Sequence, residues 1–140
     1  MQQTMMSIQT MNERIDRSQF NKWLGLKVIA ANTETLELHA AWRDEMSGNP
    51  DTGVAHGGVL AAIIDATASY TVSAATGRIG VTLDMRIDYH RAAKPGPLIA
   101  HGAVVKVGRT INTADVRLSD VSGQLVCSGR VVYFLSGKQR

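Results

Sequence analysis

The segment from Val59 to Ala75 (VLAAIIDATASYTVSAA) constrains the fold most, because its seventeen residues carry a single formal charge, on Asp65. Small and apolar side chains occupy every side of the helix that this segment would form, not one stripe. A helix that is apolar all round belongs inside a protein, covered by other elements. We therefore expect one buried helix here, ended at Thr76-Gly77, with the rest of the chain folded around it.

Period-two patterns predict that strands surround this helix. From Val81 to His90, apolar residues alternate almost without fault with polar ones, so that Thr82 is expected on the opposite face from Met85. Further strand patterns, bounded by turn formers, cover residues 27–31, 35–42, 98–107, 110–120 and 124–135. The last four predicted strands are joined by short connections, which favours an antiparallel meander. We therefore expect an α+β fold with an antiparallel sheet.

Length and composition exclude several classes of protein. With 140 residues, of which 44% are hydrophobic, the chain suits one globular domain and not a disordered polymer. We expect residues 1–24 to form a lead-in with a short helix over Glu13–Leu24, and residues 25–137 to form a single domain. The formal charge of +3 is spread along the chain, so no nucleic-acid partner is expected. The sequence contains no run of about 18 apolar residues, so no membrane span is expected. The single Cys127 favours a reducing, cytoplasmic location.

Candidate chemistry lies at the start of the helix and within it. His56, Gly57 and Gly58 precede the apolar segment, where glycines leave backbone amides accessible and the helix dipole favours an oxygen that becomes negative. The glycines alone are explained better by a tight loop-to-helix turn. Asp65 has no charged neighbour within six residues, and an isolated carboxylate in apolar surroundings is costly. A solvent-facing helix edge is the alternative, but we favour a functional carboxylate.

The spacing of Gly57 and Asp65 predicts a dimer. Eight residues of helix span about 12 Å, whereas a reacting atom must lie about 3 Å from both the carboxylate and the oxyanion donor. One helix cannot readily offer both groups to the same carbonyl. Two antiparallel copies can, if each gives its amide end to the aspartate of the other.

The string GVAHGGVLAAIIDATASY resembles the signature of the PaaI-like acyl-CoA thioesterases, which have the hotdog fold. The following GVTLDMRIDYHRAAKPGPL, and then KVGRT and GQLVCSGR, are similar to that family's next strand, turn and hairpins, so the resemblance covers residues 48–135. It implies a long central helix wrapped by an antiparallel sheet, in a homodimer or homotetramer with active sites at the subunit interface. It also implies hydrolysis of an acyl-CoA thioester to a carboxylic acid and free coenzyme A.

The resemblance implies catalytic roles for single residues. Gly57 matches the residue whose amide forms the oxyanion hole, and Asp65 of the other chain matches the nucleophile or general base. His56 matches the residue that positions the loop and the thioester, and Thr82 matches the hydroxyl that holds the attacking water. Many members have an asparagine six residues before this histidine. That position is Pro50 here, and Asn49, one residue earlier, is the candidate for the role.

The resemblance also implies contacts to coenzyme A, which is part of the substrate, so no separate cofactor is expected. The predicted contact residues are Gly58, Asp84, Tyr89, His90, Arg91, Lys94, Lys106, Gly108, Arg109 and Thr110. The four cations of this set suit phosphate groups. Ordinary solvated charge at turns is the alternative for each of them.

Two other functions are open to a chain of this kind. A hotdog hydratase or dehydratase would pair the carboxylate with a histidine, which the helix around Asp65 does not offer; a non-catalytic acyl-CoA-binding protein would keep the fold alone. No metal is expected, because His39, His90 and His101 lack metal-ligand spacing. Cys127 lies in a strand pattern without a nearby histidine, so we expect it in the core.

Overall fold

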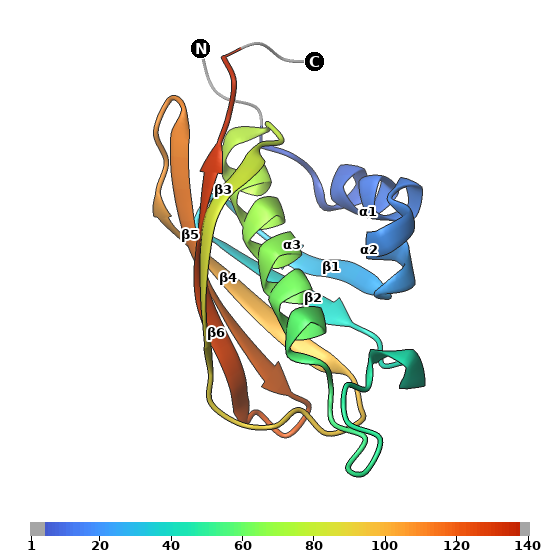
Figure 1. The fold of residues 1–140 in the computed structure, drawn as a ribbon. Coiled ribbons are helices and arrows are strands. Elements are labelled where there is room, and N and C mark those ends of the chain that lie inside the picture. Colours follow the sequence, from blue (N-terminus) through green and yellow to red (C-terminus); the bar gives the residue numbers. More distant parts are fainter. Residues whose placement is uncertain (1–4, 138–140) are drawn as a thin grey trace.

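The computed structural model describes residues 5–137, which form one curved sheet, one long helix and a pair of short helices (Figure 1). The elements in chain order are α1 Ile8–Arg17, α2 Gln19–Trp23, β1 Leu26–Ala31, β2 Thr35–Ala40, η1 Asp44–Met46, α3 Gly57–Thr76, β3 Val81–Tyr89, β4 Leu98–Lys106, β5 Ile111–Asp120 and β6 Leu125–Phe134. All strand pairs are antiparallel. The predicted α+β class, with an antiparallel sheet around a long helix, is confirmed.

Helix α3 lies in the hollow of the sheet (Figure 1). It begins after the N-cap residue His56 and ends at Gly77, whose φ of 68° is the left-handed conformation that glycine adopts most readily. Its buried side chains include Leu60, Ile63 and Ile64. By length and composition, α3 could also cross a membrane, although no such segment was expected. More than half of it is covered inside the protein, as in any buried core helix.

The sheet has the strand order β1-β2-β4-β5-β6-β3, which differs from the predicted meander of four strands. Only β4, β5 and β6 form a meander. Strand β3 pairs with β6, so that Val81 lies opposite Phe134 and Tyr89 opposite Cys127. The connection from β3 to β4 passes along the end of the sheet, past β6 and β5 (Figure 1), so these two consecutive strands are not neighbours in the sheet.

The face of β3 also differs from the prediction, because the pairing with β6 is irregular between Thr82 and Asp84. Thr82 lies opposite the buried Tyr133, and Met85 lies opposite the buried Val131. Leu83 is the extra residue of a β-bulge, which shifts the alternation by one position. Thr82 and Met85 consequently face the same side, towards α3, although the sequence pattern places them on opposite sides.

The N-terminal region forms two helices, not the single helix predicted over Glu13–Leu24. Ser18 separates them: its N–H bonds to the Arg14 carbonyl at the end of α1, and its hydroxyl accepts from the Asn21 N–H at the start of α2. The Asn12 side chain pairs with both backbone groups of Val28 and so fixes α1 against β1. The division at residues 24 and 25 stays a prediction, and residues 1–4 of the lead-in lie outside the described part.

Candidate active site

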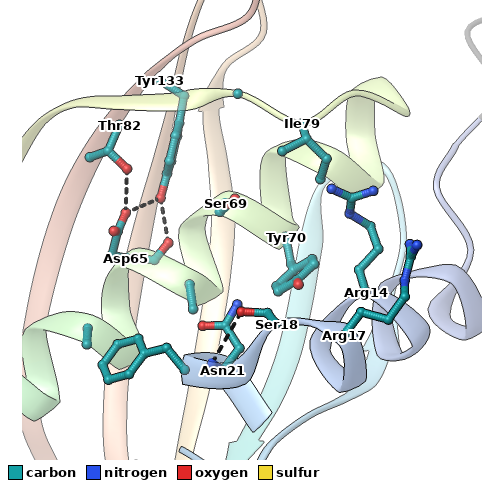
Figure 2. A pocket seen from close by; sticks show the side chains of 14 residues that line it. Arg14, Arg17, Ser18, Asn21, Asp65, Ser69, Tyr70, Ile79, Thr82 and Tyr133 are labelled. Atoms are coloured by element: carbon teal, nitrogen blue, oxygen red, sulfur yellow. Dashed lines mark hydrogen bonds between the residues drawn. The ribbon is translucent and has the colours of Figure 1, made fainter. Parts of the chain in front are cut away.

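Asp65 projects from the middle of α3 towards β3 and β6, where two hydroxyl groups meet its carboxylate (Figure 2). Thr82 Oγ1 donates to Asp65 Oδ1 at 2.9 Å, and the Tyr133 hydroxyl lies 2.7 Å from the same oxygen. The Tyr133 hydroxyl also lies 2.5 Å from the Asp65 carbonyl oxygen. The structure therefore joins Asp65 with the predicted Thr82 and holds the carboxylate through Oδ1.

Tyr133 is a site residue that sequence reasoning missed. Its side chain is 2% exposed, and burial followed by the Asp65 charge raises the pKa of its hydroxyl. The tyrosine thus stays a neutral hydrogen-bond donor across the physiological range. A tyrosine at an inward position of a strand needs a partner for its hydroxyl, and that signal was available in the sequence. The identity of the partner, 68 positions away, depends on how α3 lies against β6.

A cavity of about 490 Å³ opens beside the Asp65 carboxylate. Asp65 Oδ2 has no hydrogen-bond partner among the described residues, so it is the carboxylate oxygen available to a ligand. The cavity is lined by Arg14, Arg17, Ser18, Phe20, Asn21, Ala62, Asp65, Ala66, Ser69, Tyr70, Ile79, Gly80, Thr82 and Tyr133. Helices α1 and α2 therefore contribute to the site, which nothing in the sequence pattern indicated.

The first turn of α3 forms a second group of predicted site residues. His56 Nδ1 accepts from the Gly58 N–H at 2.8 Å and caps the helix, and a Cβ on Gly58 would lie only 3.0 Å from that nitrogen. The Tyr89 hydroxyl donates to the Gly57 carbonyl at 2.6 Å. No acceptor among residues 5–137 is bonded to the Gly57 N–H. This amide is therefore open to an oxygen from outside, at the positive end of the helix dipole.

The two groups lie apart within one chain. Gly57 and Asp65 occupy the same helix, and eight residues of helix separate them by about 12 Å. The structure thus brings Asp65 to Thr82, and His56 to Gly57 and Gly58, but it does not bring the open amide of a chain to the carboxylate of the same chain.

Asn49 lies in the loop between η1 and α3. Its side-chain Oδ1 accepts from the N–H groups of Asp51 and Thr52, at 2.9 and 3.3 Å, and its carbonyl accepts from Gly53. These bonds shape the loop that leads to His56. A contact of Asn49 with substrate stays a prediction.

The residues predicted to contact coenzyme A lie at both ends of the sheet. Arg91 and Lys94 follow β3, whereas Lys106 and Arg109 lie at the other end of β4, a nine-residue strand that spans roughly 30 Å. The two pairs of cations cannot contact one phosphate group within a single chain. Asp84 follows the bulge in β3 and is exposed.

The remaining predicted contacts already have intramolecular partners. His90 Nε2 lies 2.8 Å from Ser128 Oγ, and the Gly108 N–H donates to Asn112 Oδ1. The Thr110 carbonyl accepts from the Leu135 N–H at 2.7 Å. Contacts of these residues with coenzyme A stay predictions.

Cys127 is fully buried, which confirms its predicted place in the core. Burial raises the pKa of its thiol to about 12, so the nucleophilic thiolate does not form at neutral pH. In the described part of the chain, no group of three histidine, cysteine, aspartate or glutamate side chains could hold a metal ion. Asp65 is the single carboxylate among the described residues that line the cavity.

A family model of the thioesterase superfamily matches residues 52–127, which is more than half of the chain. The chain belongs to the thioesterase superfamily. It is a thioester hydrolase with the hotdog fold of that superfamily. The narrower PaaI-like assignment is consistent with this match and stays a prediction.

Solved structures share this fold. One X-ray structure from the thioesterase superfamily superposes with a TM-score of 0.89 at 40% identity, over 92% of this chain and 98% of the other. A Streptococcus mutans protein, solved with acetyl CoA bound, superposes with a TM-score of 0.73 at 26% identity, over 82% of this chain and 91% of the other.

Curated relatives agree with this assignment. The medium/long-chain acyl-CoA thioesterase YigI of Escherichia coli K12 is 24% identical over 132 residues, which cover 83% of this chain and 84% of that protein. A Halobacterium salinarum protein named as an esterase is 30% identical over 99 residues. That match covers 67% of this chain and 65% of the relative, slightly under two thirds of its length.

Proposed function

We propose that this thioesterase hydrolyses acyl-CoA thioesters, with Asp65 of one subunit and the Gly57 amide of its partner acting on the same carbonyl. The observation that carries the proposal is the Asp65 carboxylate, held through Oδ1 by Thr82 and Tyr133 while Oδ2 stays open beside a cavity. The acyl-CoA substrate is supported by the name of the Escherichia coli relative and by the acetyl CoA in the Streptococcus mutans structure.

In the proposed reaction, Asp65 Oδ2 takes a proton from a water molecule, and the water oxygen attacks the thioester carbonyl carbon. The carbonyl oxygen becomes negative and accepts a hydrogen bond from the Gly57 N–H of the partner subunit. The carbon–sulfur bond then breaks, and the proton held by Asp65 passes to the departing thiolate. The products are a carboxylic acid and free coenzyme A, without a metal or cofactor. Direct attack by Asp65, through an anhydride, is the alternative role of the same carboxylate.

A shared site requires a dimer, and β3 is the strand that suits it. It forms one edge of the sheet, yet it exposes apolar side chains, with Val81 67% and Leu83 56% accessible. Exposed apolar edge strands pair readily with another chain. Antiparallel pairing of two β3 strands would extend the sheet across a homodimer and run the two α3 helices in opposite directions. A further pairing into a homotetramer is compatible with this arrangement.

The same pairing would account for the separated cations. In an antiparallel pair, the β3 end of one subunit lies at the same end of the joined sheet as the β4 end of its partner. Arg91 and Lys94 of one chain would then lie on the same side of the dimer as Lys106 and Arg109 of the other. Phosphate groups of coenzyme A could be held between them. We place the enzyme in the cytoplasm, in keeping with its single, reduced cysteine.

Thiol release measured with a disulfide reagent tests the proposed function. The wild-type protein should release thiol from acyl-CoA, and Asp65→Asn should lower turnover by at least about 100-fold, because the amide cannot take a proton. Unfolding temperatures of the two proteins provide the control for folding. Near-normal turnover of Asp65→Asn would contradict the assignment. Hydration of an enoyl-CoA without thiol release would instead indicate a hydratase, and saturable binding without either reaction would indicate an acyl-CoA-binding protein.

A further inference from the structure

The part of the cavity remote from Asp65 has a chemical character that hydrolysis itself does not require. Arg14 and Arg17 line it from α1, and Asn21 lines it from α2. Figure 2 shows the Arg14 side chain extending from α1 towards Ile79, just beyond the end of α3, with the Arg17 side chain beside it. A simple alkyl chain could form neither a hydrogen bond nor an ion pair with two guanidinium groups.

Neither arginine is neutralised by an ion pair within residues 5–137 of one chain. Asp65 is the single acidic residue among the described residues that line the cavity. Tyr70 lines the same cavity; burial raises the pKa of its hydroxyl, and a hydrogen bond with Asn21 and then the Arg14 charge oppose that rise. The cavity therefore has a negative end at Asp65 and a positive, hydrogen-bonding end at Arg14, Arg17 and Tyr70.

We propose that Arg14 and Arg17 form a subsite for the far end of the acyl group and select acyl chains that end in a carboxylate. This inference rests on the proposed function, because it takes Asp65 as the position of the thioester carbonyl. Asp65 and Tyr70 are five residues apart on α3, an axial distance of roughly 7 Å. Arg14 and Arg17 line the same cavity from α1, so an acyl chain that starts at Asp65 and runs past Tyr70 would extend towards them. Guanidinium groups bind carboxylates through two parallel hydrogen bonds, which a methyl end cannot form.

Coenzyme A phosphates are the other anions that these arginines could bind, and the experiment separates the two. Glutaryl-CoA and pentanoyl-CoA have the same acyl length and the same nucleotide, and differ in the terminal carboxylate. We would measure kcat/KM for both substrates with the wild type, with Arg14→Met/Arg17→Met and with Arg14→Lys/Arg17→Lys. Arg117→Met, on the outer face of the sheet, is the matched control.

The wild type should prefer glutaryl-CoA. The methionine pair should lower kcat/KM for glutaryl-CoA by about 10- to 100-fold, the size of one lost charged hydrogen-bonded contact, and leave pentanoyl-CoA nearly unchanged. The lysine pair should recover part of the loss, and Arg117→Met should have no effect. An equal loss on both substrates would assign the arginines to coenzyme A and overturn the proposal, as would a wild type that prefers pentanoyl-CoA. Hydrolysis of neither substrate would instead contradict the proposed function.

Discussion

At the scale of single residues, the site depends on one open amide and one held carboxylate. Gly57 is the first residue of α3, a position where proline is tolerated because its nitrogen needs no helical acceptor. His56 has the extended backbone that precedes proline readily, with φ −63° and ψ 132°. The amide can therefore be removed without breaking the helix.

Gly57→Pro should fold and lose activity. Loss of one oxyanion-hole donor costs about 100- to 1,000-fold in kcat. Gly57→Ala keeps the N–H, and its Cβ would meet the Tyr89 ring at an ordinary 3.4 Å, so it should keep most of the activity. Thermal unfolding of both variants checks the fold. Equal activity of the two variants would show that the Gly57 amide is not the donor.

Cys127 predicts a specific pH dependence of stability. Its thiol pKa rises from 9.0 in the unfolded chain to about 12 in the fold. Below pH 9 both states are protonated and the stabilisation is complete; above it the unfolded chain loses a proton that the folded chain keeps. At pH 11 the free energy of unfolding should have lost up to about 3 kcal/mol through this group alone. Cys127→Ala lacks this loss.

Urea unfolding at pH 8 and pH 11, at equal protein concentration, measures the effect. The stability difference between wild type and Cys127→Ala should shrink by that amount as the pH rises. A difference that stays constant would mean that the thiol is accessible to solvent in the folded protein.

At the scale of elements, β3 carries both the active site and the proposed interface. Its bulge at Leu83 turns Thr82 towards Asp65, and Met85, on the same face of the strand as Thr82, is still 37% exposed. Met85→Glu should place a charge in the proposed interface and shift the protein towards monomers, with activity lost in parallel. Val121→Glu, at the exposed turn after β5, is the control. Analytical sedimentation measures the oligomeric state of both variants. If Met85→Glu forms a dimer as stable as that of the wild type, the interface lies elsewhere.

The sequence pattern predicted most elements but fewer of the relations between them. Helix α3 was clear because a segment with one charge must be buried, and the strands were clear from their alternation. The pairing of β3 with β6 was missed, since short connections favour neighbours in the chain. The face of Thr82 was predicted wrongly, because a bulge adds one residue without a mark in the alternation. Contacts such as Tyr133 to Asp65 depend on this packing and could not be predicted.

At the scale of the whole molecule, one chain holds two half-sites at different positions along α3. Asp65 with Thr82 and Tyr133 forms one, and the Gly57 amide forms the other. Pairing through β3 would complete two sites in each dimer, and each would take one half from each chain. The same pairing would also bring one pair of cations from each chain to the same end of the dimer.

Complementation between two inactive variants tests the shared site most directly. Asp65→Asn and Gly57→Pro chains, carrying different affinity tags, are unfolded together, refolded and purified through both tags. A hybrid dimer has one site with both defects and one site with none. The account predicts that each variant alone is nearly inactive, and that the hybrid releases thiol from acyl-CoA at about half the wild-type rate per dimer. A folded hybrid dimer as inactive as its parents would contradict a site shared between subunits.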